Sequence, residues 1–160
     1  MAALEESGEL ENTVFALTAD HYPYGLRDEC INELVGHKVE QNFELYRNGF
    51  FIWTPGRDAQ EYDSPMCSLD ILPTLSNLFG LDYDSRLLMG RDVFSDTEAL
   101  AIFNDRSWIT ERGSYNANTR EVTGKMDQAY IDRINTLVHG KFVYSAKILE
   151  RDYYRVVLED

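Results

Sequence analysis

An aspartate and a histidine, Asp20 and His21, stand side by side directly after the apolar run of residues 14–17. A carboxylate oxygen and a neutral imidazole nitrogen are both common ligands of divalent metal ions. A strand that ends in this pair would present two metal ligands from a rigid element. Such ions need at least four donor atoms, so two ligands do not complete a site. The structural alternative is that the pair caps a turn, as adjacent Asp and His after a strand more often do.

The element that must position the pair is a strand expected over residues 13–18. This run is short, rich in β-formers and nearly continuous in apolar character, which is typical of a buried strand. In open α/β sheets, ligands bind beyond the carboxyl ends of the strands, which is where Asp20 and His21 would project. A Tyr-Pro-Tyr-Gly loop, residues 22–25, follows them.

The rest of the chain predicts helices and strands in alternation, followed by short antiparallel strands. The helix at residues 70–80 is the best defined, because Asp70 can accept hydrogen bonds from first-turn amides and Gly80 can end it. Residues 111–113 are typical of a tight turn between two strands. The expected helices are residues 3–7 (ended by Gly8), 28–35, 70–80, 127–138 and a last one capped by Ser145 that continues into Tyr153 and Tyr154; the other expected strands are residues 50–54 (buried), 101–103, 107–110 and 119–123.

This order of elements indicates an α/β fold, with a mixed sheet, flanking helices and an antiparallel edge. Two of the helices carry apolar residues at helical spacing, which predicts faces packed against a core. These residues are Ile71, Leu72, Leu75, Leu78 and Phe79 in the first helix, and Tyr130, Ile131, Ile134, Leu137 and Val138 in the second.

Acidic residues dominate the composition: 28 Asp and Glu stand against 15 Lys and Arg, a formal charge of −13. This balance argues against nucleic acid, whose affinity rests on basic side chains that neutralise phosphates, and against an electrostatic hold on anionic lipid. Apolar stretches stay far below the roughly 20 residues that cross a bilayer. We therefore expect a soluble segment with no nucleic-acid partner and no membrane contact of its own.

Other residues that could do chemistry are better explained by structural roles. His37 reads as a surface histidine, and His139 precedes Gly140 at an expected helix end, where a cation complements the helix dipole. Cys30 and Cys67 match no metal motif and indicate two buried free thiols. The remaining candidates lack a neighbouring base or the spacing of a calcium loop: Ser64, Ser68, Ser107 and Thr110, and Asp82, Asp84 and Asp92.

Several motifs occur in the order seen in one enzyme family. The segment leading into Asp20-His21 resembles the stretch before the second metal-ligand pair of sulfatase-like enzymes. Later segments resemble the strand, helix and loop that follow in that family, and Ser107–Tyr115 resembles the branch of lipoteichoic acid synthases and related phosphoglycerol transferases. Together they cover about two thirds of the chain. The segments are residues 4–14, 18–21, 50–56, 68–75, 80–81, 90–94 and 107–115.

The resemblance implies the alkaline-phosphatase-like superfamily, whose enzymes attack a phosphate or sulfate ester with a metal-activated Thr, Ser or formylglycine nucleophile. It implies a divalent ion, manganese foremost with calcium, magnesium and zinc as alternatives, bound in part by Asp20 and His21. Such an ion lowers the pKa of the nucleophile and stabilises charge on the transferring group. Sulfatases place a Gly after the Asp-His pair, whereas Tyr22-Pro23-Tyr24 follows here and favours the phosphoglycerol transferase branch.

The resemblance further implies that residues 1–160 are the C-terminal segment of a sulfatase-like catalytic domain. The nucleophile and the other ligands would lie in an absent N-terminal part, the expected partner of this chain. The segment would then contain no catalytic and no further cofactor-binding residue, and would be inactive alone. Its parent would be membrane-anchored and act on a glycolipid or phosphoester substrate at the extracytoplasmic face of a bacterial membrane, in cell-envelope synthesis. Unpaired strand edges would favour self-association of the segment.

A rival hypothesis is a noncatalytic module that retains the same fold and serves in binding or assembly. The missing nucleophile and the acidic surface motivate it. A Thr, Ser or Cys in a strand-to-helix turn upstream, with an earlier acidic ligand, would favour the enzyme.

Overall fold

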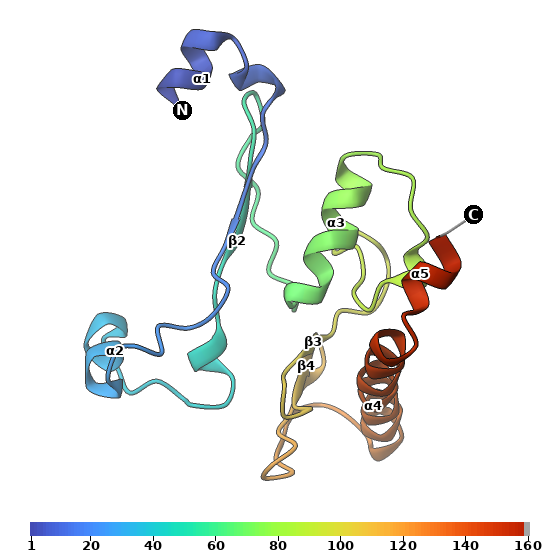
Figure 1. Cartoon of the computed structure of the whole chain (residues 1–160). Coiled ribbons are helices and arrows are strands. Elements are labelled where there is room, and N and C mark those ends of the chain that lie inside the picture. The colour runs from blue at the N-terminus through green and yellow to red at the C-terminus, as the bar shows by residue number, and fades with distance from the viewer. Residues whose placement is uncertain (159–160) are drawn as a thin grey trace. The chain divides into compact units, whose positions relative to one another are not determined.

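The computed structural model describes residues 1–158 and divides into two compact units, residues 1–61 and residues 62–160 (Figure 1). Each unit has its own small sheet: two strands in the first, and four strands in sequential order in the second. The mixture of helices and strands agrees with the sequence-based prediction. A single mixed sheet does not form among the described residues, because every strand pair there is antiparallel.

The N-terminal unit is built on one long-range strand pair. Its elements are α1 (Ala2–Ser7), a 3-10 turn η1 (Leu10–Asn12), β1 (Phe15–Thr18), α2 (Asp28–Val35), a 3-10 turn η2 (Glu44–Tyr46) and β2 (Phe50–Trp53). Gly8 and Gly36 end α1 and α2 with φ of 75° and 85°, the left-handed conformation that glycine adopts without strain. The predicted bounds of α2 are confirmed.

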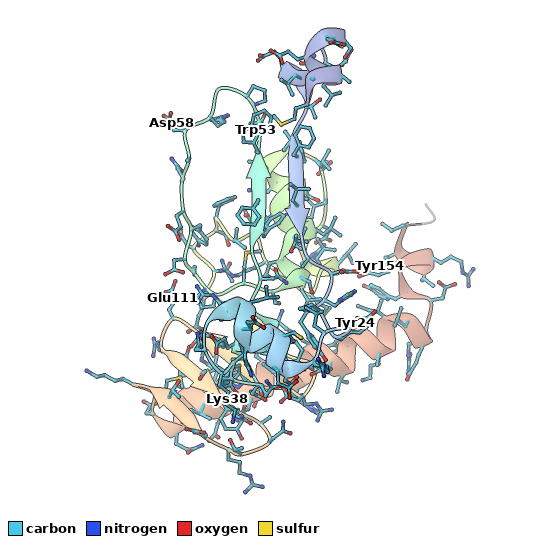
Figure 2. The ribbon with its side chains drawn as sticks, turned by 90° about the vertical axis from the view of Figure 1, so that its left-hand side faces the viewer. Tyr24, Lys38, Trp53, Asp58, Glu111 and Tyr154 are labelled. Atoms are coloured by element: carbon cyan, nitrogen blue, oxygen red, sulfur yellow. The ribbon has the colours of Figure 1, made fainter. Side chains whose placement is uncertain are left out.

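The expected burial of β1 and β2 is wrong. Alternate residues of the two strands share one face of the sheet, and we call Phe15, Leu17, Phe51 and Trp53 the apolar sheet face. Leu17 is 60% and Phe51 67% exposed, and Phe15, Leu17 and Trp53 line an apolar cavity of about 230 Å³ with Met1. Trp53 ends β2 (Figure 2). A two-stranded sheet has no further layer of its own to cover this face, although the residue types are those of a buried strand.

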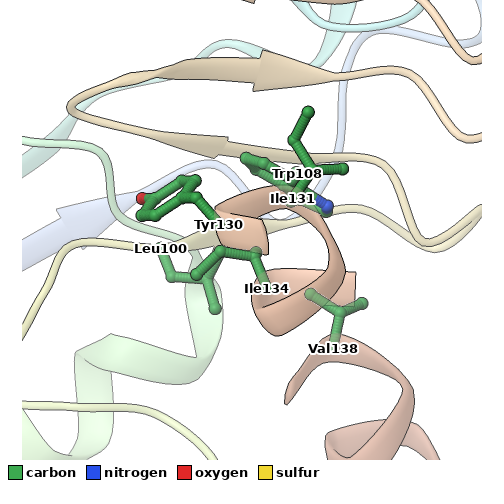
Figure 3. Packing of buried hydrophobic residues seen from close by; sticks show 6 residues of the cluster. All are labelled: Leu100, Trp108, Tyr130, Ile131, Ile134 and Val138. Carbon is green, nitrogen blue, oxygen red and sulfur yellow. The ribbon is translucent and has the colours of Figure 1, made fainter. Parts of the chain in front are cut away.

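The C-terminal unit contains a hydrophobic core between its sheet and a long helix. Its elements are η3 (Ser68–Asp70), α3 (Ile71–Leu78), η4 (Ser85–Leu87), β3 (Ala101–Ile102), β4 (Trp108–Thr110), β5 (Gly113–Tyr115), β6 (Val122–Gly124), α4 (Gln128–Glu150) and α5 (Tyr153–Leu158). Trp108 is fully buried against Tyr130, Ile131 and Ile134, and its indole N–H donates to Asn135 at 2.9 Å (Figure 3). Leu100 and Val138 complete this cluster.

Several sequence-based expectations fail in this unit. α4 runs through Ser145, so no new helix begins there; Asp127 caps the N-terminus of α4, and nothing in the next twenty residues breaks it. β5 replaces part of an expected loop, and β6 begins at Val122 instead of Thr119. Leu137 is 43% exposed, although the other four predicted core residues of α4 are buried. Of the expected turn at residues 111–113, residues 111 and 112 connect β4 to β5, and Gly113 is the first residue of β5.

A buried carboxylate fixes the start of α3. Asp70 is 3% exposed, and its two oxygens accept from the backbone N–H of Cys67 at 3.0 Å and of Arg91 at 2.8 Å. The Thr74 hydroxyl donates to the Asp70 carbonyl at 2.6 Å and accepts from the Val93 N–H at 3.1 Å. The sequence places Asp70 as the cap of α3, whereas the structure uses it to join the loop around Arg91 to the turn before the helix.

The burial of α3 does not follow the apolar stripe of its sequence. Pro73, Thr74 and Ser76 are buried, and the Thr74 hydroxyl bonds to the loop at Val93. The predicted packing is wrong for Leu72, Leu78 and Phe79, which are 58%, 51% and 52% exposed.

Replacing Gly90 by alanine should lower the free energy of unfolding of the C-terminal unit by about 2 kcal/mol or more. A Cβ at Gly90 would lie 1.9 Å from the Leu69 carbonyl oxygen, and a backbone atom cannot swing away. Gly140→Ala in α4 is the matched control, because its Cβ would meet only the Tyr144 ring at 3.9 Å and alanine favours a helix. Urea unfolding measures both, and equal stability of the two variants would contradict the prediction.

Candidate metal centre

The Asp-His pair lies in the loop that leaves β1, and the strand pairing fixes where that loop begins. Thr18 ends β1 opposite Phe50 of β2. Its hydroxyl donates to the Asn48 side chain at 3.2 Å, and the Asn48 amide reaches the Ala19 carbonyl at 3.5 Å. Asn48 therefore connects the residue before Asp20 to the start of β2.

The two side chains present their donor atoms together. His21 Nε2 lies 3.5 Å from Asp20 Oδ1, and the side chains are 50% and 88% exposed, respectively. The other ring nitrogen, Nδ1, lies 2.7 Å from the carbonyl oxygen of Tyr22. A carbonyl can only accept, so Nδ1 must carry the proton, and Nε2 of the neutral ring keeps its lone pair. Histidines that bind metals are oriented in this way.

This donor set fits part of the coordination shell of a divalent ion. One carboxylate oxygen and one imidazole nitrogen suit manganese and zinc, and the carboxylate also suits calcium and magnesium. Over residues 1–158, no group of three or more His, Cys, Asp or Glu side chains gathers in a metal-binding arrangement. Asp20 and His21 would thus hold such an ion with further ligands that this described part of the chain does not add.

Tyrosine rings surround the pair. The Tyr24 N–H donates to the Tyr22 carbonyl at 2.7 Å, the same oxygen that His21 contacts, so the turn at Pro23 and the histidine share one acceptor. This turn places the Tyr24 ring 4.3 Å from the His21 ring. Tyr22 also meets the rings of Tyr24 and Tyr46 edge-on, at 6.1 and 5.3 Å. The Tyr-Pro-Tyr loop is visible in the sequence, but Tyr46 carries no signal that would join it to the loop.

A compact turn before η2 holds Tyr46. The Glu40 carboxylate accepts from the backbone N–H of Asn42, Phe43 and Glu44 at 2.6 to 3.2 Å. Burial opposes ionisation of Glu40, but these three hydrogen bonds outweigh it and lower the pKa of the carboxyl group. His37 Nε2 lies 2.6 Å from Glu44 Oε1, with the histidine side chain 55% exposed, so its predicted surface position is confirmed.

The other candidates from the sequence have structural contacts. His139 lies within α4 instead of at a helix end. Cys30 and Cys67 are free thiols of intermediate burial, and desolvation raises the pKa of Cys67. Arg86 lowers the pKa of Asp84 to about 2. Three of the hydroxyls and one further aspartate form hydrogen bonds with neighbouring groups: Ser64 with Glu111, Ser107 with Asp105 and Ala117, Thr110 with Gly113 and Arg112, and Asp92 with Asn77.

Comparison with known families decides how this geometry is to be interpreted. A family model described as Sulfatase matches residues 1–81, half of the chain, including Asp20 and His21. The chain belongs to the sulfatase family. The resemblance seen in the motifs is thereby confirmed, and β1, β2 and the start of the C-terminal unit through α3 lie within the matched range.

Relatives and solved structures extend the likeness over nearly the whole sulfatase-family chain. Lipoteichoic acid synthases of Staphylococcus aureus strains USA300 and COL are each 26% identical over 153 residues, which cover 93% of this chain and 23% of the relative. The chain thus spans about a quarter of the length of these relatives. The crystal structure of an alkaline phosphatase superfamily protein from Vibrio parahaemolyticus matches with a TM-score of 0.62 at 16% identity, over 96% of this chain and 39% of that one. At this identity the match shows the fold alone.

Glu40→Gln should loosen the turn that holds Tyr46. A carboxyl group with a lowered pKa in the folded state stabilises that state above its unfolded pKa, and the contribution is lost as pH falls through the folded value. We expect the amides of Asn42, Phe43 and Glu44 to lose protection against hydrogen exchange in Glu40→Gln at pH 7, and in the unchanged chain only as pH falls through the lowered pKa of Glu40. Glu33→Gln in α2 is the control. Undiminished protection of these amides in Glu40→Gln would show that the hydrogen bonds do not hold the turn.

Proposed function

We propose that this chain is the C-terminal segment of the catalytic domain of a metal-dependent phosphotransferase of the phosphoglycerol transferase type. The observation that carries the proposal is the geometry of Asp20 and His21, whose carboxylate and lone-pair nitrogen lie together within the range matched by the sulfatase model. The likeness to lipoteichoic acid synthases over 93% of the chain favours transfer of a phosphate ester over a sulfate ester. The Tyr-Pro loop after His21 favours the same branch.

Each residue has a definite part in this proposal. Asp20 supplies an anionic oxygen, and His21 supplies Nε2, while the hydrogen bond from Nδ1–H to the Tyr22 carbonyl orients the ring. A divalent ion bound there, manganese foremost, would act as a Lewis acid towards the nucleophile and the phosphoryl oxygens. Asn48 keeps the loop in register with the sheet, so that both donors project from one rigid end of β1.

The nucleophile and the further ligands would come from an N-terminal part of the same catalytic domain. The apolar sheet face supports this, because its four residues have the character of a buried sheet yet reach 67% exposure. In the described part of the chain, no helix has the length and apolar character that a membrane crossing requires. The likeness to lipoteichoic acid synthases supports a phosphoester substrate of the cell envelope, handled on the extracytoplasmic side of a bacterial membrane.

In the complete parent protein with Mn²⁺, Asp20→Ala and His21→Ala should each reduce phosphoester turnover by about 100-fold or more, because each removes a ligand of the ion. Asp58→Ala, an exposed carboxylate in the same unit, should retain activity. If the Asp20→Ala and His21→Ala variants of the parent still turn over phosphoesters at the full rate, the proposed roles of these residues are wrong. A parent without any such activity would favour the noncatalytic binding or assembly module.

The 160-residue chain by itself should self-associate through the apolar sheet face, since contiguous exposed apolar surface drives association. Phe51→Lys should shift the chain towards the monomer in light scattering, because it places a charge at the centre of that face. Leu34→Lys, at a residue 76% exposed on α2, is the matched control. A monodisperse monomer of the unchanged chain would contradict the expectation.

A further inference from the structure

We infer that Tyr24 is the stacking platform for a sugar ring of the substrate, next to the Asp20-His21 pair. We call Tyr22, Tyr24 and Tyr46 the aromatic cluster. The inference rests on the proposed function and adds to it a residue that selects the substrate and the chemical class that it selects, a phosphoester carried by a glycosyl group.

The position of Tyr24 is fixed by the same hydrogen bonds that fix His21. The Tyr22 carbonyl accepts both from His21 Nδ1, at 2.7 Å, and from the Tyr24 N–H, at 2.7 Å. Pro23 lies between the two tyrosines and restricts the backbone of the turn. The Tyr24 ring therefore stands 4.3 Å from the His21 ring, and a group attached to a phosphate at the metal centre would come within reach of it.

The cluster is open to ligands, and Tyr24 is labelled in Figure 2. Tyr24 is 67% and Tyr46 43% exposed, while Tyr22, which contacts both rings edge-on, is half-buried. A tyrosine held in place offers a large contact area at small entropic cost, together with a hydroxyl group for hydrogen bonding. A cluster formed only for packing would bury its rings, whereas this one leaves Tyr24, the ring that contacts His21, the most exposed of the three.

The net charge of the N-terminal unit favours a neutral ligand group beside the transferred phosphate. The N-terminal unit holds twelve acidic and four basic residues, so a second anionic group beside the transferred phosphate would be repelled. A sugar ring is neutral, and its C–H face stacks on a single exposed aromatic ring. One exposed ring, that of Tyr24, is enough for this stacking.

The test is a titration of the 160-residue chain with methyl β-glucopyranoside, followed by amide NMR shifts, without metal. We expect saturable shifts in the loop at His21 and Gly25. Tyr24→Ala should weaken the apparent affinity about tenfold, while Tyr24→Phe, which keeps the ring, should retain it. Tyr144→Ala removes a tyrosine that is 62% exposed in α4 and is the matched control. The inference would be overturned if the shifts did not saturate, or if Tyr24→Ala bound the sugar as tightly as the unchanged chain. Tighter binding of tetramethylammonium than of the sugar at the same residues would also overturn it.

A second measurement on the parent protein separates this inference from the proposed function. Tyr24→Ala should raise KM for a glycosylated phosphoester about tenfold with little change in kcat, and leave KM for glycerol phosphate unchanged. If Asp20→Ala loses turnover but Tyr24→Ala keeps its KM for the glycosylated phosphoester, only the proposed role of Tyr24 is overturned. Sugar binding to the chain combined with a parent inactive on phosphoesters would instead overturn the proposed function.

Discussion

The antiparallel register of β1 against β2 is the constraint on which the candidate site depends. Pairing of Thr18 with Phe50 brings Asn48 to the end of β1, where its amide group joins Thr18 to Ala19. A slip of one residue would turn the strand over, since side chains alternate between the two faces. The same register gathers the apolar sheet face on one side. The metal-ligand pair and the apolar surface are therefore two consequences of one pairing.

Signals local in sequence gave the most accurate predictions of the fold. The bounds of α2 follow from Gly36 at its end, and the start of α4 follows from the Asp127 cap. Burial was predicted less well, because apolar residues on one face of a strand or helix show that the face is suited to burial but not whether another element covers it. Leu17 and Leu72 have the right residue type for a core and are 60% and 58% exposed. Ser145 shows the converse, since a good capping residue is tolerated inside a helix that already has its cap.

The candidate site was only partly accessible to sequence reasoning. That Asp20 and His21 lie together follows from adjacency, and their role in metal binding stays a prediction. The orientation of the ring could not be foreseen, because it depends on the Tyr22 carbonyl facing back towards His21. Tyr46 joins the loop only through the turn that Glu40 organises, across more than twenty residues of chain.

The burial of Cys67 has a consequence for the reactivity of its thiol. Its backbone N–H is tied to Asp70, and desolvation raises the pKa of its thiol. Thiol–disulfide exchange proceeds through the thiolate, which is scarce at neutral pH when the pKa is raised. Cys67 should therefore react slowly with small disulfides and alkylating reagents, so that a free cysteine persists where mixed disulfides would otherwise form.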